Sequence, residues 1–285
     1  MVVGRSPGLT FGCLLVPRRK SIPATRIATP QSSAVMINLR VLTLRKVEDG
    51  AVATPADALA ARLAAALVPL ADPEAAVAMR SYMKDVAPYL GIATPARRAA
   101  TMPIVRALGT SPDPATVIEA AIALAGRRER EHSYTAADLL DRHVRSLDAS
   151  HLDALRALVV RGAWWDTTDA LAKVVNQLGR RLPEVDLAME RWVVDQDGWV
   201  RRVAIIHQLG RRADADLDRL FRFCLLHAGD PWFFTRKAIG WALRDATTTF
   251  PVEVSAFVRD HADVLSPLSQ REAMKRLDRA ATSET

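Results

Sequence analysis

From Thr54 onward, apolar residues recur at helical spacing and are interrupted by typical helix starts and stops. Thr54-Pro55 and Asp72-Pro73 each place a capping side chain before a proline, and we expect the two helices to reach about Leu70 and Val86. Thr94-Pro95 starts a third helix, and the loop 109–114 precedes a fourth that ends near Ala125. Further helices are predicted at about 134–147, 149–161, 163–181, 184–195, 198–210, 214–228, 231–248, 251–263 and 267–281. Helices joined by short connections, without a strand pattern, indicate helical hairpins.

The second half of the chain contains an internal repeat of 34 residues. The period relates Trp165, Trp199 and Phe233; Ala170, Ala204 and Ala238; and Leu171, Ile205 and Ile239. Apolar positions that keep a fixed period are typical of stacked helical hairpins. The period equals that of tetratricopeptide repeats, but their characteristic residues are not found. We therefore predict an all-α fold, a right-handed superhelical solenoid of HEAT-like helical hairpins with a concave face.

Charge divides the chain into two parts. Residues 1–47 contain eight basic and no acidic residues, although the formal net charge of the whole chain is +7. Removing these eight from the 39 basic residues leaves 31 against 32 acidic ones, so any nucleic-acid surface in the remainder must be a local patch. We predict a disordered basic extension at 1–50 and a single repeat domain at 51–285. An organelle transit peptide, or a start at Met36, is the alternative for the extension.

Cysteine, histidine and hydropathy patterns narrow the functional class. The two cysteines form no disulfide framework, which favours a reducing, cytoplasmic compartment. The six histidines show no metal-ligand spacing, so neither a metal nor a cofactor is expected. No apolar run is long enough for a membrane span.

The repeat places aromatic and charged residues on corresponding helix faces. The pairs are Trp165 with Asp169, Trp199 with Arg202, and Phe233 with Lys237, followed by Trp241 and Arg244. Cations beside aromatic rings suit a phosphate backbone and its sugars, whereas a carboxylate in such a strip should repel phosphate and needs a reason. Structural roles remain open, because tryptophans at helical spacing are usually core and Asp169 could be a solvated helix charge.

One segment of this strip resembles a known motif. Trp164-Trp165-Asp166-Thr167-Thr168-Asp169 closely resembles the Trp-Trp-Asp-x-x-Asp motif of the AlkD-type alkylpurine DNA glycosylases, a HEAT-like-repeat family of DNA alkylation repair enzymes. Blocks at 80–84, 91–98, 199–206, 232–244 and 267–273 match in the same order. The resemblance covers about residues 55–280, and the ordered set is specific although each block alone is weak.

The resemblance implies a site and an activity. It implies a catalytic aspartate at Asp169 and two tryptophans, Trp165 and Trp241, that embrace the deoxyribose of the lesion. It implies DNA contacts along the concave surface at Tyr82, Arg202, Phe233, Phe234, Lys237 and Arg244. The expected partner is double-stranded alkylated DNA, bound by a monomer that removes N3- or N7-alkylated purines without flipping the base into a pocket. The alternative is a non-catalytic HEAT-like module that binds DNA or a protein, and the pattern leaves the physiological lesion open.

Overall fold

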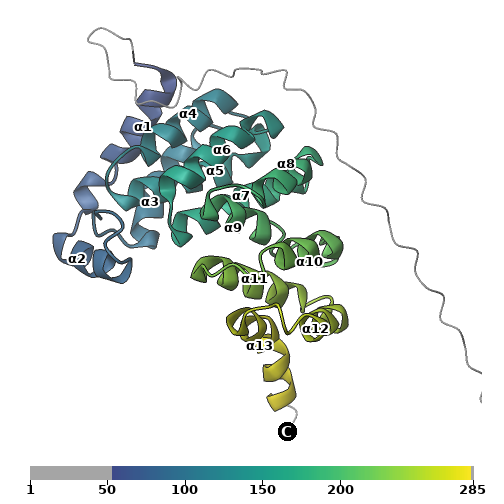
Figure 1. Cartoon of the computed structure of the whole chain (residues 1–285). Coiled ribbons are helices and arrows are strands. Elements are labelled where there is room, and N and C mark those ends of the chain that lie inside the picture. The colour runs from purple at the N-terminus through teal and green to yellow at the C-terminus, as the bar shows by residue number, and fades with distance from the viewer. Residues whose placement is uncertain (1–52, 284–285) are drawn as a thin grey trace, which may run out of the picture. The chain divides into compact units, whose positions relative to one another are not determined.

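A computed structural model describes residues 53–283 (Figure 1). The helices are α1 (Pro55–Ala65), α2 (Pro73–Tyr82), α3 (Thr94–Arg106), α4 (Pro114–Ala125), α5 (Arg130–Arg142), α6 (Leu152–Gly162), α7 (Trp165–Gly179), α8 (Glu184–Trp192), α9 (Gly198–Ile206), α10 (Leu217–Leu226), α11 (Phe233–Ala246), α12 (Pro251–Asp260) and α13 (Pro267–Ser283). Short 3-10 helices lie at Val68–Leu70, Val144–Ser146, Ala149–His151 and Arg212–Asp214. Over this range every regular element is a helix, which confirms the predicted all-α class. The predicted extension at 1–50 lies outside the described residues, so the domain boundary stays a prediction.

The helix starts follow the caps that the sequence contains. The Thr54 side chain accepts a hydrogen bond from the Asp57 amide, and the Asp57 carboxylate accepts one in return from the Thr54 amide. Asp72 and Asp113 cap α2 and α4 with carboxylates that each accept hydrogen bonds from two amides of the first turn. Helix α2 ends at Tyr82, earlier than predicted, because Lys84 and Asp85 adopt φ values of 60° and 56°, which a right-handed helix does not allow.

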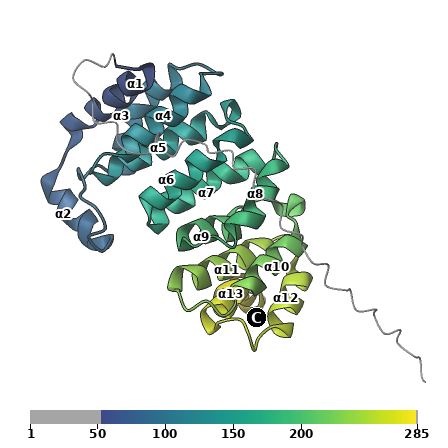
Figure 2. The same cartoon turned by 45° about the horizontal axis from the view of Figure 1, so that its top comes forward.

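Alternate helices form one layer of the structure. Helices α3, α5, α7, α9, α11 and α13 pack in that order, each against the next, and the helices between them in sequence cover the other side (Figure 2). The repeat positions Leu171, Ile205 and Ile239 are all buried in this stack, which confirms the role predicted for the 34-residue period. The layer of α7, α9, α11 and α13 also carries most of the predicted site residues. The handedness of the superhelix stays a prediction.

A buried carboxylate fixes the loop that leads into α3. Glu131, fully buried on α5, accepts hydrogen bonds from the amides of Leu90, Gly91 and Ile92 at 2.9, 2.9 and 3.1 Å. Gly91 has a φ of +86°, and a Cβ atom there would lie 1.9 Å from the Asp72 carbonyl oxygen. This position therefore requires glycine, and the block at 91–98 owes part of its pattern to this turn.

A second glycine allows α11 and α13 to approach closely. A Cβ atom on Gly240 would lie 2.5 Å from Cβ of Glu272 and 3.0 Å from the Ser269 carbonyl oxygen. The Ser269 hydroxyl also donates a hydrogen bond of 2.9 Å to the carbonyl of Arg236 on α11. These contacts bring the Glu272 side chain against the charged face of α11. No helix among residues 53–283 is long and apolar enough to cross a bilayer.

Candidate functional site

The centre of the candidate site is an ion pair between neighbouring helices of the layer. Arg202 of α9 donates from Nε to Asp169 Oδ1 at 2.8 Å and from Nη2 to Asp169 Oδ2 at 2.9 Å. Its Nη1 donates to the Phe234 carbonyl oxygen at 2.9 Å, and its Cζ lies 5.9 Å from the centre of the Trp241 ring. Three consecutive layer helices, α7, α9 and α11, thus fix the position of one guanidinium group.

Burial sets the electrostatics of this pair. The Arg202 side chain is 5% exposed and the Asp169 side chain 19%. Burial raises the pKa of the Asp169 carboxyl, and the hydrogen bonds and charge of Arg202 oppose this rise. The nearby carboxylate of Asp166 raises it slightly further. Arg202 is therefore the group that favours the ionised form of Asp169.

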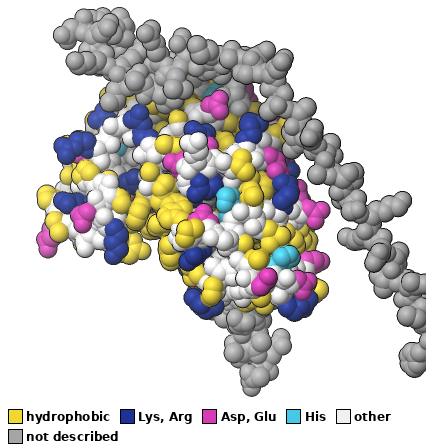
Figure 3. Space-filling view, viewed as in Figure 1, with side chains coloured by type: hydrophobic (Ala, Val, Ile, Leu, Met, Phe, Trp, Pro, Cys, Tyr) yellow, Lys and Arg dark blue, Asp and Glu magenta, His cyan; other side chains and the backbone are white. Residues whose placement is uncertain are grey.

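A half-open cavity of about 270 Å³ lies beside this pair. Seven of the nine residues predicted for the site line it, namely Trp165, Arg202, Phe233, Phe234, Lys237, Trp241 and Arg244. Asp169 adjoins it through its contact with Arg202. On the face seen in Figure 3, apolar side chains gather in the middle, and basic side chains lie at the left and lower edges.

Tyr82 lies apart from the other predicted residues. It is the last residue of α2, is 74% exposed, and lines a different cavity of about 390 Å³. Trp165 lines both cavities. The cavity that Tyr82 lines and the cavity beside Asp169 thus share one lining residue, Trp165.

Trp199 does not lie on the strip where the repeat placed it. It is buried among aromatic side chains, with ring centres 5.8 Å from Trp164 and 4.7 Å from Trp232 and Phe234. Trp165 is the first residue of α7, whereas Trp199 is the second residue of α9. One residue rotates a side chain by about 100° around a helix, which turns Trp199 from the surface into the core.

Glu272 of α13 is a second carboxylate in the strip, where the pattern indicated a single one. Its Oε1 lies 2.8 Å from Lys237 Nζ and its Oε2 lies 2.6 Å from Arg244 Nη1. The hydrogen bond from Lys237 lowers the pKa of Glu272, so the carboxylate is ionised and neutralises part of the charge of both cations. Glu272 lies in the block at 267–273, which resembles the family pattern. The spacing of residues in the sequence did not show that its carboxylate contacts α11.

A second buried ion pair lies one turn before Asp169. Arg130 of α5 donates from Nε and Nη2 to the two carboxylate oxygens of Asp166, and Tyr134 donates its hydroxyl to the same carboxylate. The Tyr89 and Tyr134 hydroxyl oxygens lie 3.0 Å apart. Asp166 is therefore held by α5, a contact that its place in the motif did not predict. In the described part of the chain, no three His, Cys, Asp or Glu side chains are grouped to hold a metal.

Comparison with known proteins identifies the family. A family model described as DNA alkylation repair enzyme matches residues 63–277, so the chain belongs to this family of repair enzymes. A solved structure described as a predicted DNA alkylation repair enzyme from Enterococcus faecalis is 32% identical, with a TM-score of 0.68 over 72% of this chain and 95% of that one. The structure of smu.31 from Streptococcus mutans UA159 is 17% identical, with a TM-score of 0.48 over 59% of this chain and 87% of that one. No curated protein matches the chain.

The family and the fold together define the class of protein. It is an all-helical, hairpin-stacked member of the DNA alkylation repair enzymes, and the match confirms the resemblance on which the site residues were predicted. The role of each site residue is a separate matter and stays a prediction.

Proposed function

We propose that the protein is a monofunctional DNA glycosylase that hydrolyses the N-glycosidic bond of N3- or N7-alkylated purines in duplex DNA. The observation that carries the proposal is the Asp169 carboxylate, held by the buried Arg202 beside a half-open cavity that Trp165 and Trp241 line. A carboxylate at this place repels phosphates and so weakens a module that only binds DNA, whereas a glycosylase needs a negative charge beside the sugar. We take the protein to act as a monomer in the cytoplasm.

The chemistry requires little acid catalysis. Alkylation at N3 or N7 gives the purine a positive charge, so the base takes the electron pair of the breaking bond and leaves as a neutral molecule. Positive charge then develops on the sugar, where the Asp169 carboxylate stabilises it electrostatically. Water adds to the anomeric carbon, and Asp169 orients the water and accepts its proton.

Arg202 maintains the carboxylate in the form that this step needs. A buried carboxyl without a partner tends to be protonated, and a neutral group cannot stabilise a cationic sugar. The two hydrogen bonds from Arg202 also fix the orientation of the Asp169 carboxylate, and with it the direction of the lone pairs that remain free. The DNA-backbone contact predicted for Arg202 stays a prediction beside this positioning role.

The surroundings favour an extended substrate and a hydrolytic reaction. The faces of Trp165 and Trp241 suit a cationic sugar and base, and a half-open cavity leaves room for large alkyl adducts on an unflipped base. Lys237 forms an ion pair of 2.8 Å with Glu272, and we assign it a DNA-backbone contact rather than the role of nucleophile in a covalent lyase step.

Comparing lesions of different charge tests this proposal. Purified protein should release 7-methylguanine and 3-methyladenine from duplex DNA and leave the neutral base uracil in a matched duplex untouched. Equal release of uracil would contradict the leaving-group argument. DNA binding without release of any base would support the non-catalytic alternative.

A further inference from the structure

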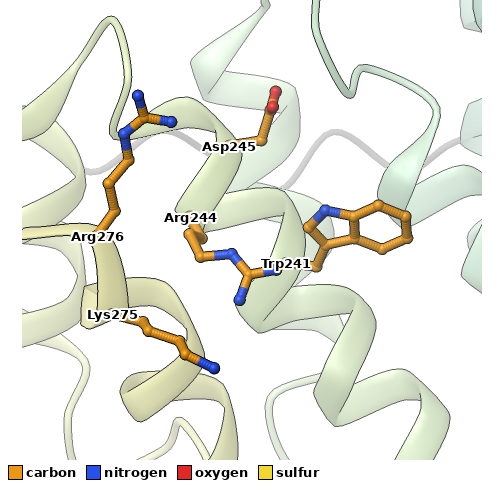
Figure 4. Close-up of a pocket in the computed structure, with 5 residues that line it drawn as sticks. All are labelled: Trp241, Arg244, Asp245, Lys275 and Arg276. Carbon is orange, nitrogen blue, oxygen red and sulfur yellow. The ribbon is translucent and has the colours of Figure 1, made fainter. Parts of the chain in front are cut away.

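A cavity of about 540 Å³ with a largely basic lining is formed by α11 and α13. Its lining consists of Trp241, Arg244 and Asp245 from α11 and of Lys275 and Arg276 from α13 (Figure 4). Three cations and a single carboxylate thus line one open space, and one of the cations, Arg244, is paired with Glu272. Trp241 and Arg244 also line the cavity of the proposed active site, so the two cavities adjoin.

This carboxylate forms no ion pair with Lys275 or Arg276. Asp245 Oδ2 accepts a hydrogen bond of 2.7 Å from the Gly210 amide, which commits that oxygen to the loop after α9. Lys275 and Arg276 are exposed and form no ion pair with another side chain in the described part of the chain. In the neighbouring cavity, by contrast, Glu272 pairs with both Lys237 and Arg244. The surplus of positive charge therefore lies on the α13 side of Trp241.

We propose that this cavity binds the phosphodiester backbone of the DNA strand that flanks the lesion, with Lys275 and Arg276 as its contacts. The inference rests on the proposed function and extends its DNA footprint beyond the residues already assigned. An open site continuous with Trp241 suits a strand that passes through it, whereas a free anion would need an enclosing set of donors.

The test compares two variants that lose the same charge. In the Lys275→Ala/Arg276→Ala variant, the affinity for an undamaged duplex should fall. The slope of log K against log[salt] should become less steep by roughly 1.8 units, which corresponds to the loss of about two phosphate contacts. The control, Arg191→Ala/Arg259→Ala, removes two cations from α8 and α12 in the other layer and should leave the slope unchanged. Circular dichroism of both variants verifies the fold. A slope that is equal in the two variants would overturn the proposal.

Neutral methylphosphonate linkages locate the contact on the DNA. Placed singly on one side of a lesion analogue, they should weaken binding by the wild type at one or two positions and have no further effect on the Lys275→Ala/Arg276→Ala variant. Additive losses at every position would overturn the assignment. Inorganic phosphate, tested against chloride at equal ionic strength, should not compete selectively, and selective competition would point to a free-anion site instead. Failure of the wild type to bind any duplex would contradict the proposed function itself, which keeps the two failures distinct.

Discussion

Replacing Asp169 with asparagine removes the charge at the centre of the site while preserving its size. In the native geometry both carboxylate oxygens accept hydrogen bonds from Arg202, at 2.8 and 2.9 Å. An asparagine amide group retains one acceptor and presents N–H groups where the other acceptor stood. One donor of the buried guanidinium then faces another donor, and the positive charge of Arg202 loses its counter-ion.

The expected effect on catalysis is large. Loss of one preorganised group at a developing charge costs about 10²- to 10³-fold in rate, or roughly 2.7–4 kcal/mol. We therefore expect Asp169→Asn to lower single-turnover excision of 7-methylguanine by at least about 10²-fold. DNA affinity, measured by fluorescence anisotropy, should stay unchanged or rise slightly, because a negative charge near phosphates has been removed.

The fold is expected to weaken as well, so a matched control is needed. Breaking a buried ion pair costs up to about 3–5 kcal/mol of stability, and the partial exposure of Asp169 places it toward the lower end. Asp166→Asn breaks the comparable pair with Arg130 in the same helix turn and should lower the melting temperature at least as much. We expect that control to retain far more excision than Asp169→Asn. Equal losses in the two variants, or near-normal excision in Asp169→Asn, would refute the electrostatic role of Asp169.

Three further perturbations address its partners and the chain's N-terminal part. Arg202→Ala removes the group that opposes the burial-raised pKa of Asp169, so excision should fall at neutral pH and recover as pH rises; an unshifted pH–rate profile would contradict this. Glu272→Gln releases Lys237 and Arg244, so affinity for undamaged duplex should rise and the salt slope steepen by about one unit in anisotropy titrations, and unchanged binding would refute the idea. Deleting residues 1–47 should leave excision at physiological salt unchanged and weaken only low-salt binding, whereas a loss of helical circular dichroism would place the segment inside the domain.

Local signals were sufficient to predict the helices. Caps such as Thr54 and Asp72, and the apolar period through Leu171, Ile205 and Ile239, depend on nearby residues and repeat spacing. Helix ends were predicted less well, because the left-handed residues after Tyr82 depend on tertiary contacts of the following loop.

The pairing of charges across helices could not be predicted in the same way. Asp169 and Arg202 are 33 residues apart in the sequence. The repeat spacing predicts that they lie on neighbouring helices, but it does not show that their side chains form a buried ion pair. Glu272 joins the strip only because Gly240 allows α13 to approach α11. Trp199 was misplaced because a shift of one residue in the helix start changes the face on which a side chain lies.

The measurement that tests the central claim most directly is the identity of the product released from a duplex with a single 7-methylguanine. Wild-type protein in excess should release free 7-methylguanine, detected by mass spectrometry, and leave an abasic strand that breaks only on treatment with alkali. An intact lesion strand after prolonged incubation with protein that binds the duplex would contradict the proposed glycosylase activity.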